Sequence, residues 1–428
     1  MFHEKQLRKI NKSVGYILAM MVLVSPMLVL QIKGKELFLI LQIVFIIAMC
    51  FKYKKIVLIK SPLVVGIFIE LFISGFLAGL SSMPENYKKT AINLAIMLIP
   101  LYFVMCCIKK LLKSGTNVIE IVVRTLKLAV IVELIWIALQ LLFYRSAGID
   151  INKMIFVDTL HLVENASFIR SWVWYPSGLS WHSAALAPLF VIGYLFFDNM
   201  IIRILIVLES FFCGNSTTLL GVCLCALLLF LRNIYFTKKI KKKKIIGIGC
   251  IIVIFIAALC LTDIGEILLQ IVANLWIRLF GTEKDASTAA HFGYYSDYIK
   301  IIKNSSVLQF IFGYGYGCSG YTITSLYGRY ADGGTWAIES DYVDILVSRG
   351  IVGFLGYYMF LLYILIKGGK IDSRYFIFML VILFQGFGYN IQFDYLFFIE
   401  LFMFLCIKMN INIFDTVDKI NCLKKKRG

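Results

Sequence analysis

Charged side chains are scarce in this 428-residue chain, since Asp, Glu, Lys and Arg together make up only 16% of it. Hydrophobic residues make up 60%, and the mean hydropathy is +0.85. A water-soluble fold of this length needs more polar side chains to cover its surface. The composition therefore excludes a soluble globular protein and predicts a polytopic membrane protein.

Motifs for metals and cofactors are also missing. No CxxC, HExxH, P-loop or dinucleotide fingerprint occurs. Most of the eleven cysteines fall in or beside apolar runs without metal-ligand spacing, so we interpret them as small hydrophobic residues. Cys318 is the main cysteine of a long polar loop and has no obvious partner there. We expect no cofactor, no metal site and no structural disulfide.

Long apolar runs recur along the chain without the alternation that is typical of barrel strands. Backbone polar groups inside a bilayer must be satisfied internally, so such runs predict an all-α fold. We predict about twelve transmembrane helices, at residues 14–31, 37–51, 61–80, 91–108, 119–143, 183–197, 199–213, 216–232, 245–262, 342–366, 374–389 and 391–408. Arg203 and Glu209 fall inside the seventh, which is the least regular of them.

Clusters of lysine and arginine indicate how these helices are oriented in the membrane, because the segments on the cytoplasmic side carry the excess of positive charge. With a cytoplasmic N-terminus, every strong basic cluster falls on the cytoplasmic side, including Lys241–Lys244 and the tail Lys424–Arg427. The sequence therefore predicts both termini in the cytoplasm. The net charge of +18 follows from this topology and needs no nucleic-acid partner.

This topology divides the chain into five segments. Helices one to five occupy 1–143, a first long external loop 144–182, helices six to nine 183–262, a second long external loop 263–341, and helices ten to twelve with a basic tail 342–428. Transporters rarely need an ordered module as long as the second loop. Membrane enzymes that act on lipid-linked substrates need a water-exposed place for their chemistry, and we expect it there.

Aromatic residues gather in the two predicted external loops. Five of the six tryptophans lie there, at Trp172, Trp174, Trp181, Trp276 and Trp336. The second loop adds eight tyrosines: Tyr294, Tyr295, Tyr298, Tyr314, Tyr316, Tyr321, Tyr327 and Tyr330. Such rings form an interfacial belt at helix ends, or they stack on sugar rings. Both interpretations stay open.

The first loop ends in a turn that leads directly into the sixth helix. Pro176 and Gly178 favour that turn, and Ser180 or Ser183 can cap the helix. A helix N-terminus beside the guanidinium of Arg170 suits a phosphate or diphosphate group. The alternative is an interfacial arginine that reaches towards the headgroups.

The second loop combines a predicted helix, a glycine-rich turn and a cluster of carboxylates. The helix starts near His291 and runs to about Lys303, and the turn Phe312–Gly317 suits close approach of a ligand to the backbone. Asp341, Asp344 and Arg349 then enter the tenth predicted helix. Ionisable groups there either pair with one another or line a cavity.

At these residues the chain resembles the O-antigen polymerase family of bacterial surface-polysaccharide pathways. The resemblance covers roughly residues 165–365. It lies in the Arg-x-x-x-x-x-Pro-Ser-Gly stretch, in Gly214–Gly221 (Gly-Asn-Ser-Thr-Thr-Leu-Leu-Gly), in Phe-Gly-Tyr-Gly from Phe312, and in Glu-Ser-Asp-Tyr followed by Arg-Gly-Ile-Val-Gly.

The resemblance implies glycosyl transfer between undecaprenyl-diphosphate-linked oligosaccharides on the outer face of the bacterial inner membrane. A flippase and a chain-length regulator are the implied partners. The reaction needs charge stabilisation on the leaving diphosphate and a base for the attacking hydroxyl. The predicted catalytic residues are Arg170, His182, Glu339 and Asp341. The predicted substrate-binding residues are Arg278, His291, Tyr314, Tyr316, Arg329, Arg349, Trp174 and Trp181.

The second arginine of the diphosphate clamp is left open among Arg278, Arg329 and Arg349. Many relatives carry an arginine where this chain has His291. The related O-antigen ligases usually present a His-Asn pair where Glu339-Ser-Asp341 stands, and its absence favours a polymerase. A lipid-linked oligosaccharide flippase predicts short loops and symmetric halves, which the second loop argues against. A sugar-binding or scaffolding protein without catalysis is a further alternative.

Overall fold

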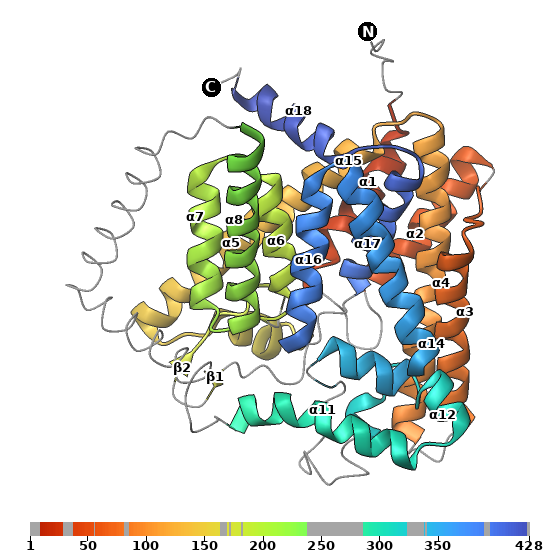
Figure 1. Cartoon of the computed structure of the whole chain (residues 1–428). Helices are drawn as coiled ribbons and strands as arrows, with labels where there is room; N and C mark the ends of the chain where they lie inside the picture. The colour runs from red at the N-terminus through yellow and green to blue at the C-terminus, as the bar shows by residue number, and fades with distance from the viewer. Residues whose placement is uncertain are drawn as a thin grey trace.

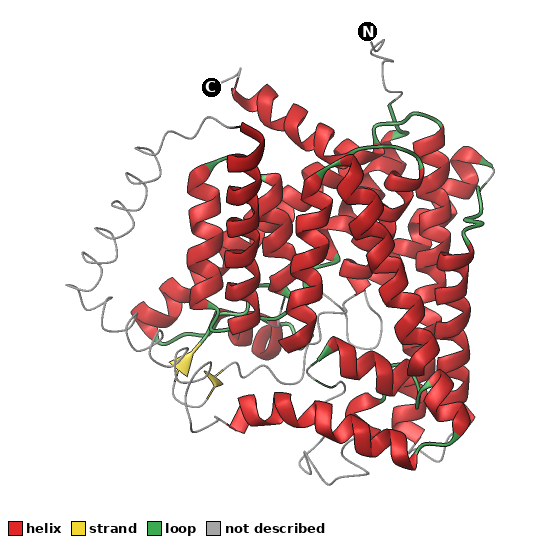
Figure 2. Ribbon diagram, in the orientation of Figure 1, coloured by secondary structure: helices red, strands yellow, loops and turns green. Residues whose placement is uncertain are grey.

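The computed structural model describes residues 9–28, 37–54, 56–80, 85–162, 169–170, 173–180, 183–237, 286–322, 338, 340–388 and 394–425. Across these ranges the chain is helical apart from one very short hairpin (Figure 2). Its strands are β1 (Ile169–Arg170) and β2 (Val173–Trp174), which pair antiparallel with Ile169 opposite Trp174. The all-α prediction is therefore confirmed for the described part of the chain.

The helices are long, apolar and mostly uninterrupted by proline, as expected where no water competes for backbone hydrogen bonds. They are α1 (Lys12–Val24), α2 (Leu37–Tyr53), α3 (Pro62–Leu80), α4 (Glu85–Lys113), α5 (Val118–Ala147), η2 (Lys153–Thr159), α6 (Leu186–Phe196), α7 (Met200–Phe212), α8 (Ser216–Thr237), α11 (Ala286–Asn304), α12 (Val307–Phe312), α14 (Asp341–Tyr363), η3 (Ile364–Gly368), α15 (Gly369–Ile371), α16 (Ser373–Gly388), α17 (Asp394–Lys408) and α18 (Ile413–Lys425).

Four of these helical segments are long and apolar enough to cross a membrane, which indicates a membrane protein. They span Pro62–Leu80, Val118–Ala147, Ser216–Ile234 and Asp341–Ile371. A fifth span is added if α17 and α18, which meet at a bend of 101°, count as one. Shorter apolar helices occupy Lys12–Val24, Leu37–Tyr53, Leu186–Phe196 and Ser373–Gly388. The predicted helix at 245–262 lies outside the described residues.

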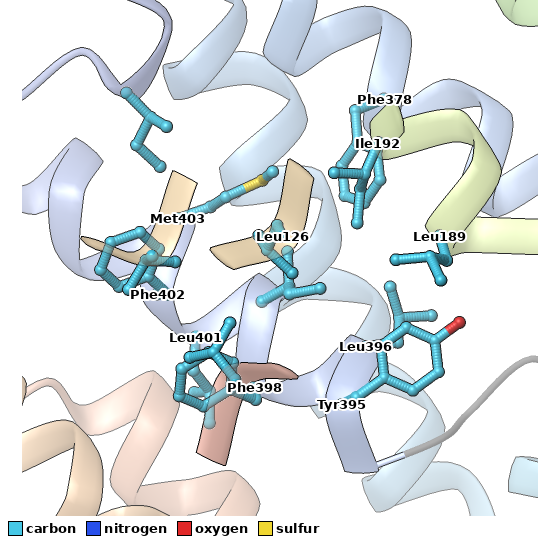
Figure 3. Close-up of a cluster of buried hydrophobic side chains, with 14 of the residues drawn as sticks. Leu126, Leu189, Ile192, Phe378, Tyr395, Leu396, Phe398, Leu401, Phe402 and Met403 are labelled. Atoms are coloured by element: carbon cyan, nitrogen blue, oxygen red, sulfur yellow. The ribbon is translucent and has the colours of Figure 1, made fainter. Parts of the chain in front are cut away.

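The core lies around α17, which is buried along almost its whole length. Figure 3 shows Tyr395, Phe398 and Met403 of α17 packed among side chains of α5, α6 and α16, such as Leu126 and Phe378. A helix that is buried on all sides is expected to be apolar on all sides. The run of Leu, Phe, Ile and Met in α17 follows this pattern except at the buried Glu400, which accepts a hydrogen bond from Tyr357.

Four elements lie at the two ends of the helical bundle (Figure 1). The hairpin, α11 and α12 lie at one end, at the bottom of the view, and α18 lies at the opposite end. There the Arg374 side chain binds Asp418 through two hydrogen bonds of 2.6 and 2.8 Å and Asp372 through three hydrogen bonds of 2.8 to 3.2 Å. The hairpin and α11 contain residues of the predicted site, which therefore lies at the α11 end of the bundle.

Two details differ from the expected helix pattern. α14 is broken at Gly350, whose φ is +64°. α5 continues to Ala147 and is followed by η2, so the start of the predicted first loop is helical. The helix predicted at 199–213 is confirmed as α7, which is continuous although Arg203 and Glu209 lie within it.

Candidate functional site

The Pro-Ser-Gly turn of the first loop rests on polar side chains of α5. The amide of Gly178 donates to Gln140 Oε1 at 2.8 Å, and the amide of Leu179 donates to Glu133 Oε2 at 2.7 Å. Ser180 Oγ donates to Glu133 Oε1 at 2.9 Å. Gly178 has φ +65°, and a Cβ there would lie 2.2 Å from Glu133 Oε2. Glycine is therefore required for this approach.

Asn152 fixes the same turn from its other side. Its Nδ2 donates to Gly178 O at 2.8 Å and to Ser177 Oγ at 3.3 Å. Trp136 Nε1 donates to Asn152 Oδ1 at 2.7 Å and orients the amide. Because the buried polar groups of the turn are satisfied by fixed partners, the turn is held in one conformation.

The second motif, Gly214–Gly221, packs directly against the first. Gly214 has φ +62°, and a Cβ there would lie 2.3 Å from the ring of Tyr175. Thr218 Oγ1 donates to Ser183 O at 2.9 Å, and its amide donates to Asn215 Oδ1 at 3.0 Å. The start of α8 therefore adjoins the Pro-Ser-Gly turn, although neither motif by itself predicts the contact.

The glycine-rich turn of the second loop fits into the break of α14. The amide of Tyr314 donates to Val347 O at 2.8 Å, and that of Gly315 donates to Ser348 O at 2.9 Å. Gly350 does not adopt the helical conformation. The turn donates hydrogen bonds to the carbonyl groups of residues that precede Gly350 in α14. The prediction that this segment is a turn is confirmed.

The fit between turn and helix leaves no room for side chains at two glycines. A Cβ at Gly313, where φ is +79°, would lie 2.3 Å from the carbonyl carbon of Ser348. A Cβ at Gly350 would lie 2.5 Å from the amide nitrogen of Gly313. Ser74 of α3 also donates to Ser348 O, at 2.9 Å. The glycines serve the contact between backbone segments, which is a structural role.

Arg349 forms a buried ion pair with Glu70 of α3. Its Nε lies 3.0 and 3.2 Å from the two carboxylate oxygens, and Nη2 makes a further short contact with Oε2. The two side chains are 3% and 7% exposed, so neither charge faces bulk water. Arg349 is therefore paired, but with Glu70 of α3 and not, as one interpretation expected, with Asp341 or Asp344.

A second layer of contacts surrounds this ion pair. The Arg349 guanidinium lies 5.7 Å from the ring centre of Tyr357, whose hydroxyl donates to Glu400 at 3.0 Å. A Cβ at Gly353 would lie 2.7 Å from Glu70 Oε1, so glycine leaves room for the carboxylate. Arg349 thus joins α3 to α14 next to the break.

Asp341 and Asp344 lie in the first turn of α14, where the helix dipole stabilises negative charge. They are only 4% and 5% exposed. Ser319 donates a short hydrogen bond to Asp344 Oδ1 and accepts one from the amide of Ile338 at 3.1 Å. Burial, with Asp344 beside it, raises the pKa of the neighbouring Cys318 thiol to about 12.

α11 closes this end of the bundle. The hydroxyl of Tyr295 donates to Phe387 O at 3.0 Å and lies 3.1 Å from Ser340 Oγ, just before Asp341. The hydroxyls of Tyr314 and Ser305 are 2.9 Å apart. α11 runs from Ala286 to Asn304, so the helix expected between His291 and Lys303 is confirmed and begins earlier.

The end of α16 connects the start of α8, next to the Pro-Ser-Gly turn, to the start of α14. Gln385 Nε2 donates to Thr217 O at 3.4 Å, and Gly221 provides the space for the amide. The adjacent Gly386 lies against Asp341, since a Cβ there would be 3.2 Å from Oδ2. The Pro-Ser-Gly turn, α8, α16 and the start of α14 therefore form one continuous region.

The predicted site residues fall into three groups. Arg170 and Trp174 lie in the hairpin and His291 in α11, where the structure describes the backbone. Asp341, Tyr314, Tyr316 and Arg349 belong to the region described above, and Tyr316 packs against the main core. The remaining five lie outside the described residues: Trp181, His182, Arg278, Arg329 and Glu339.

Sequence reasoning missed the residues that hold the site in place. Glu70, Glu133, Asn152 and Gln385 all contact motif residues, yet none of them lies in a motif. A signal was present for the two glutamates, because a carboxylate inside a predicted membrane span marks either a functional group or a buried partner.

Comparisons with known proteins add no family. No protein-family model matches this chain, and a search of curated proteins finds no match. Among the described residues, no group of three or more His, Cys, Asp or Glu side chains is arranged to hold a metal ion.

Proposed function

We propose that this protein is a membrane glycosyltransferase of the O-antigen polymerase type. It would join oligosaccharide repeat units carried on undecaprenyl diphosphate, at the outer face of the bacterial cytoplasmic membrane. One observation carries the proposal: sequence stretches that resemble that family, far apart in the chain, pack together at one end of the helical bundle. A common functional site explains why these stretches meet, whereas separate structural roles would not require them to lie together.

The proposed topology has twelve spans and two cytoplasmic termini. The hairpin, α11 and α12 would then lie on the external side, and α18 with its basic residues on the cytoplasmic side. The positions of these elements at opposite ends of the bundle are compatible with this arrangement. Anionic lipids of the inner leaflet would attract the lysines that follow Ile420.

In the proposed reaction a hydroxyl of the newly delivered unit attacks the anomeric carbon of the growing chain. The new glycosidic C–O bond forms as the bond from the anomeric carbon to the diphosphate oxygen breaks. The hydroxyl proton passes to a carboxylate, and the lipid diphosphate leaves with the electron pair. Asp341 or Glu339 is the proposed acceptor of the proton, with His182 as the alternative.

Arg170 is the proposed partner of the leaving diphosphate. It lies in the hairpin, six residues before Pro176, and the turn that follows is fixed by α5. A guanidinium at the reaction site can stabilise the charge that develops on the leaving group. Arg278 or Arg329 would complete the clamp, because Arg349 is already neutralised by Glu70.

The aromatic residues divide between structural and sugar-binding roles. Tyr314 contacts Ser305 and Tyr316 packs into the core, so both support the glycine turn. Trp174 and Trp181, which flank the Pro-Ser-Gly turn, are the proposed stacking partners for sugar rings.

A deletion strain tests the proposal. The surface polysaccharide would be separated by gel in strains that carry no copy, the wild-type chain, Arg170→Ala, or the control Arg145→Ala, which alters an exposed arginine at the end of α5. We expect the ladder to collapse to one repeat unit without the protein. Wild type and Arg145→Ala should restore the ladder, and Arg170→Ala should not. Loss of even the single unit would favour a flippase or ligase and overturn the proposal.

A further inference from the structure

Glu133, which holds the Pro-Ser-Gly turn, has a second buried glutamate, Glu209, within electrostatic range. Glu133 of α5 is fully buried, and Glu209 of α7 is 7% exposed. Glu133 lies near enough to repel Glu209 electrostatically, and α5 packs against α7. Two carboxylates close together in a low dielectric cannot both carry a charge without compensation.

Their surroundings distinguish the two groups. Glu133 accepts hydrogen bonds from the Leu179 amide and the Ser180 hydroxyl, both of which favour an ionised carboxylate. Glu209 Oε2 is buried and has no hydrogen-bond partner. An unpartnered buried carboxylate is far more costly than an unpartnered carboxylic acid.

No compensating positive charge faces Glu209 from the described part of the neighbouring helices. On its own helix, Arg203 donates to Tyr194 O at 3.1 Å and lies 3.8 Å from Asp198. Tyr194 of α6 and Cys225 of α8 interact with Arg203 and do not act on Glu209. The other ionisable group close to both glutamates is the thiol of Cys213, which is neutral.

We propose that Glu133 and Glu209 form a buried proton-binding site, in which Glu209 holds a proton at neutral pH and Glu133 anchors the Pro-Ser-Gly turn. Loss of that proton would place a negative charge beside Glu133 and disturb the carboxyl group that holds Leu179 and Ser180. The site thereby links proton occupancy to the position of the turn. It does not rest on the proposed function.

Dicyclohexylcarbodiimide tests the site, because this reagent modifies protonated carboxyl groups in apolar surroundings. The purified full-length protein would be labelled in detergent and the modified residues identified by mass spectrometry. Glu70 is a matched internal control, since it is as buried as Glu209, at 6% exposed, but is paired with Arg349. We expect Glu209 to be labelled about tenfold more than Glu70 at neutral pH, because only Glu209 carries a proton.

A second measurement covers the case in which the reagent cannot reach Glu209. The infrared band of a protonated carboxyl group should be weaker in Glu209→Gln than in wild type and unchanged in Glu70→Gln. The band supports the proposal even without labelling, whereas absence of both the label and the band overturns it. Protection of Glu209 by sodium chloride, but not by choline chloride, would also overturn it by assigning the site to a metal cation.

Discussion

Two glycine-containing turns lie at the same end of this molecule but are held by different means. The Pro-Ser-Gly turn is held by side chains, chiefly Glu133, Gln140 and Asn152. The turn at Gly313 is held by backbone hydrogen bonds to a broken helix. The first turn can therefore respond to the charge of a side chain, whereas the second is fixed by shape. We expect the first turn to change conformation with that charge and the second turn to stay rigid.

The largest effect is expected from closing the space between the second turn and α14. Gly313→Ala should destabilise the protein by about 3 to 5 kcal/mol, since the new Cβ would overlap the backbone of Ser348 at a positive φ. Gly356→Ala on α14 is the matched control, because no atom lies within 4 Å of a Cβ there. It should be neutral or stabilising by up to about 1 kcal/mol.

Thermal unfolding in detergent measures both variants through a thiol-reactive dye, which reports exposure of buried free cysteines such as Cys106 and Cys406. Equal melting temperatures for Gly313→Ala and Gly356→Ala would contradict the rigid contact between the turn and α14.

The buried ion pair beside the second turn gives the next effect. Arg349→Met leaves Glu70 without its partner in the core and should cost about 3 to 5 kcal/mol. The double variant Glu70→Gln, Arg349→Met removes the stranded charge and should regain at least about 1 kcal/mol of that loss. If the double variant is no more stable than Arg349→Met in the same dye assay, the pair is not electrostatically coupled.

The first turn should tolerate the loss of one side-chain contact better. Gln140→Ala leaves the amide of Gly178 unpaired and should destabilise by about 1 to 3 kcal/mol. Leu142→Ala, on an exposed face of the same helix, is the control and should change the melting temperature much less. An effect of Gln140→Ala as large as that of Gly313→Ala would remove the distinction between the two turns.

The smallest effect is expected at the opposite end of the bundle. Burial alone would raise the pKa of Asp372, but its hydrogen bonds with Arg374 and the charges of Arg374 and Arg232 outweigh burial and lower that pKa. Because the folded-state pKa lies below the unfolded one, this stabilisation is present above the unfolded pKa. It is lost as the pH falls through the folded value.

Asp372→Asn should therefore lower stability by about 1 kcal/mol at neutral pH and make less difference in acid. Melting curves of wild type and variant across acidic and neutral pH measure this difference. A gap between them that widens as the pH falls would contradict the assignment.

The sequence by itself determined the features that depend on local composition and pattern. The scarcity of charge and the long apolar runs gave the helical membrane class, and α3 and α5 formed close to the predicted residues. The glycine-rich segment at Gly313 and the helix near His291 were also predictable, because turn and helix preferences act over a few residues.

The tertiary structure alone decided which distant groups meet. Arg349 and Glu70 are separated by 279 positions, and Leu179 and Glu133 by 46. Nothing local marks such pairs, because a buried charge selects its partner through the packing of whole helices. The break at Gly350 depends likewise on a turn that arrives from another segment to bind the carbonyl groups before it.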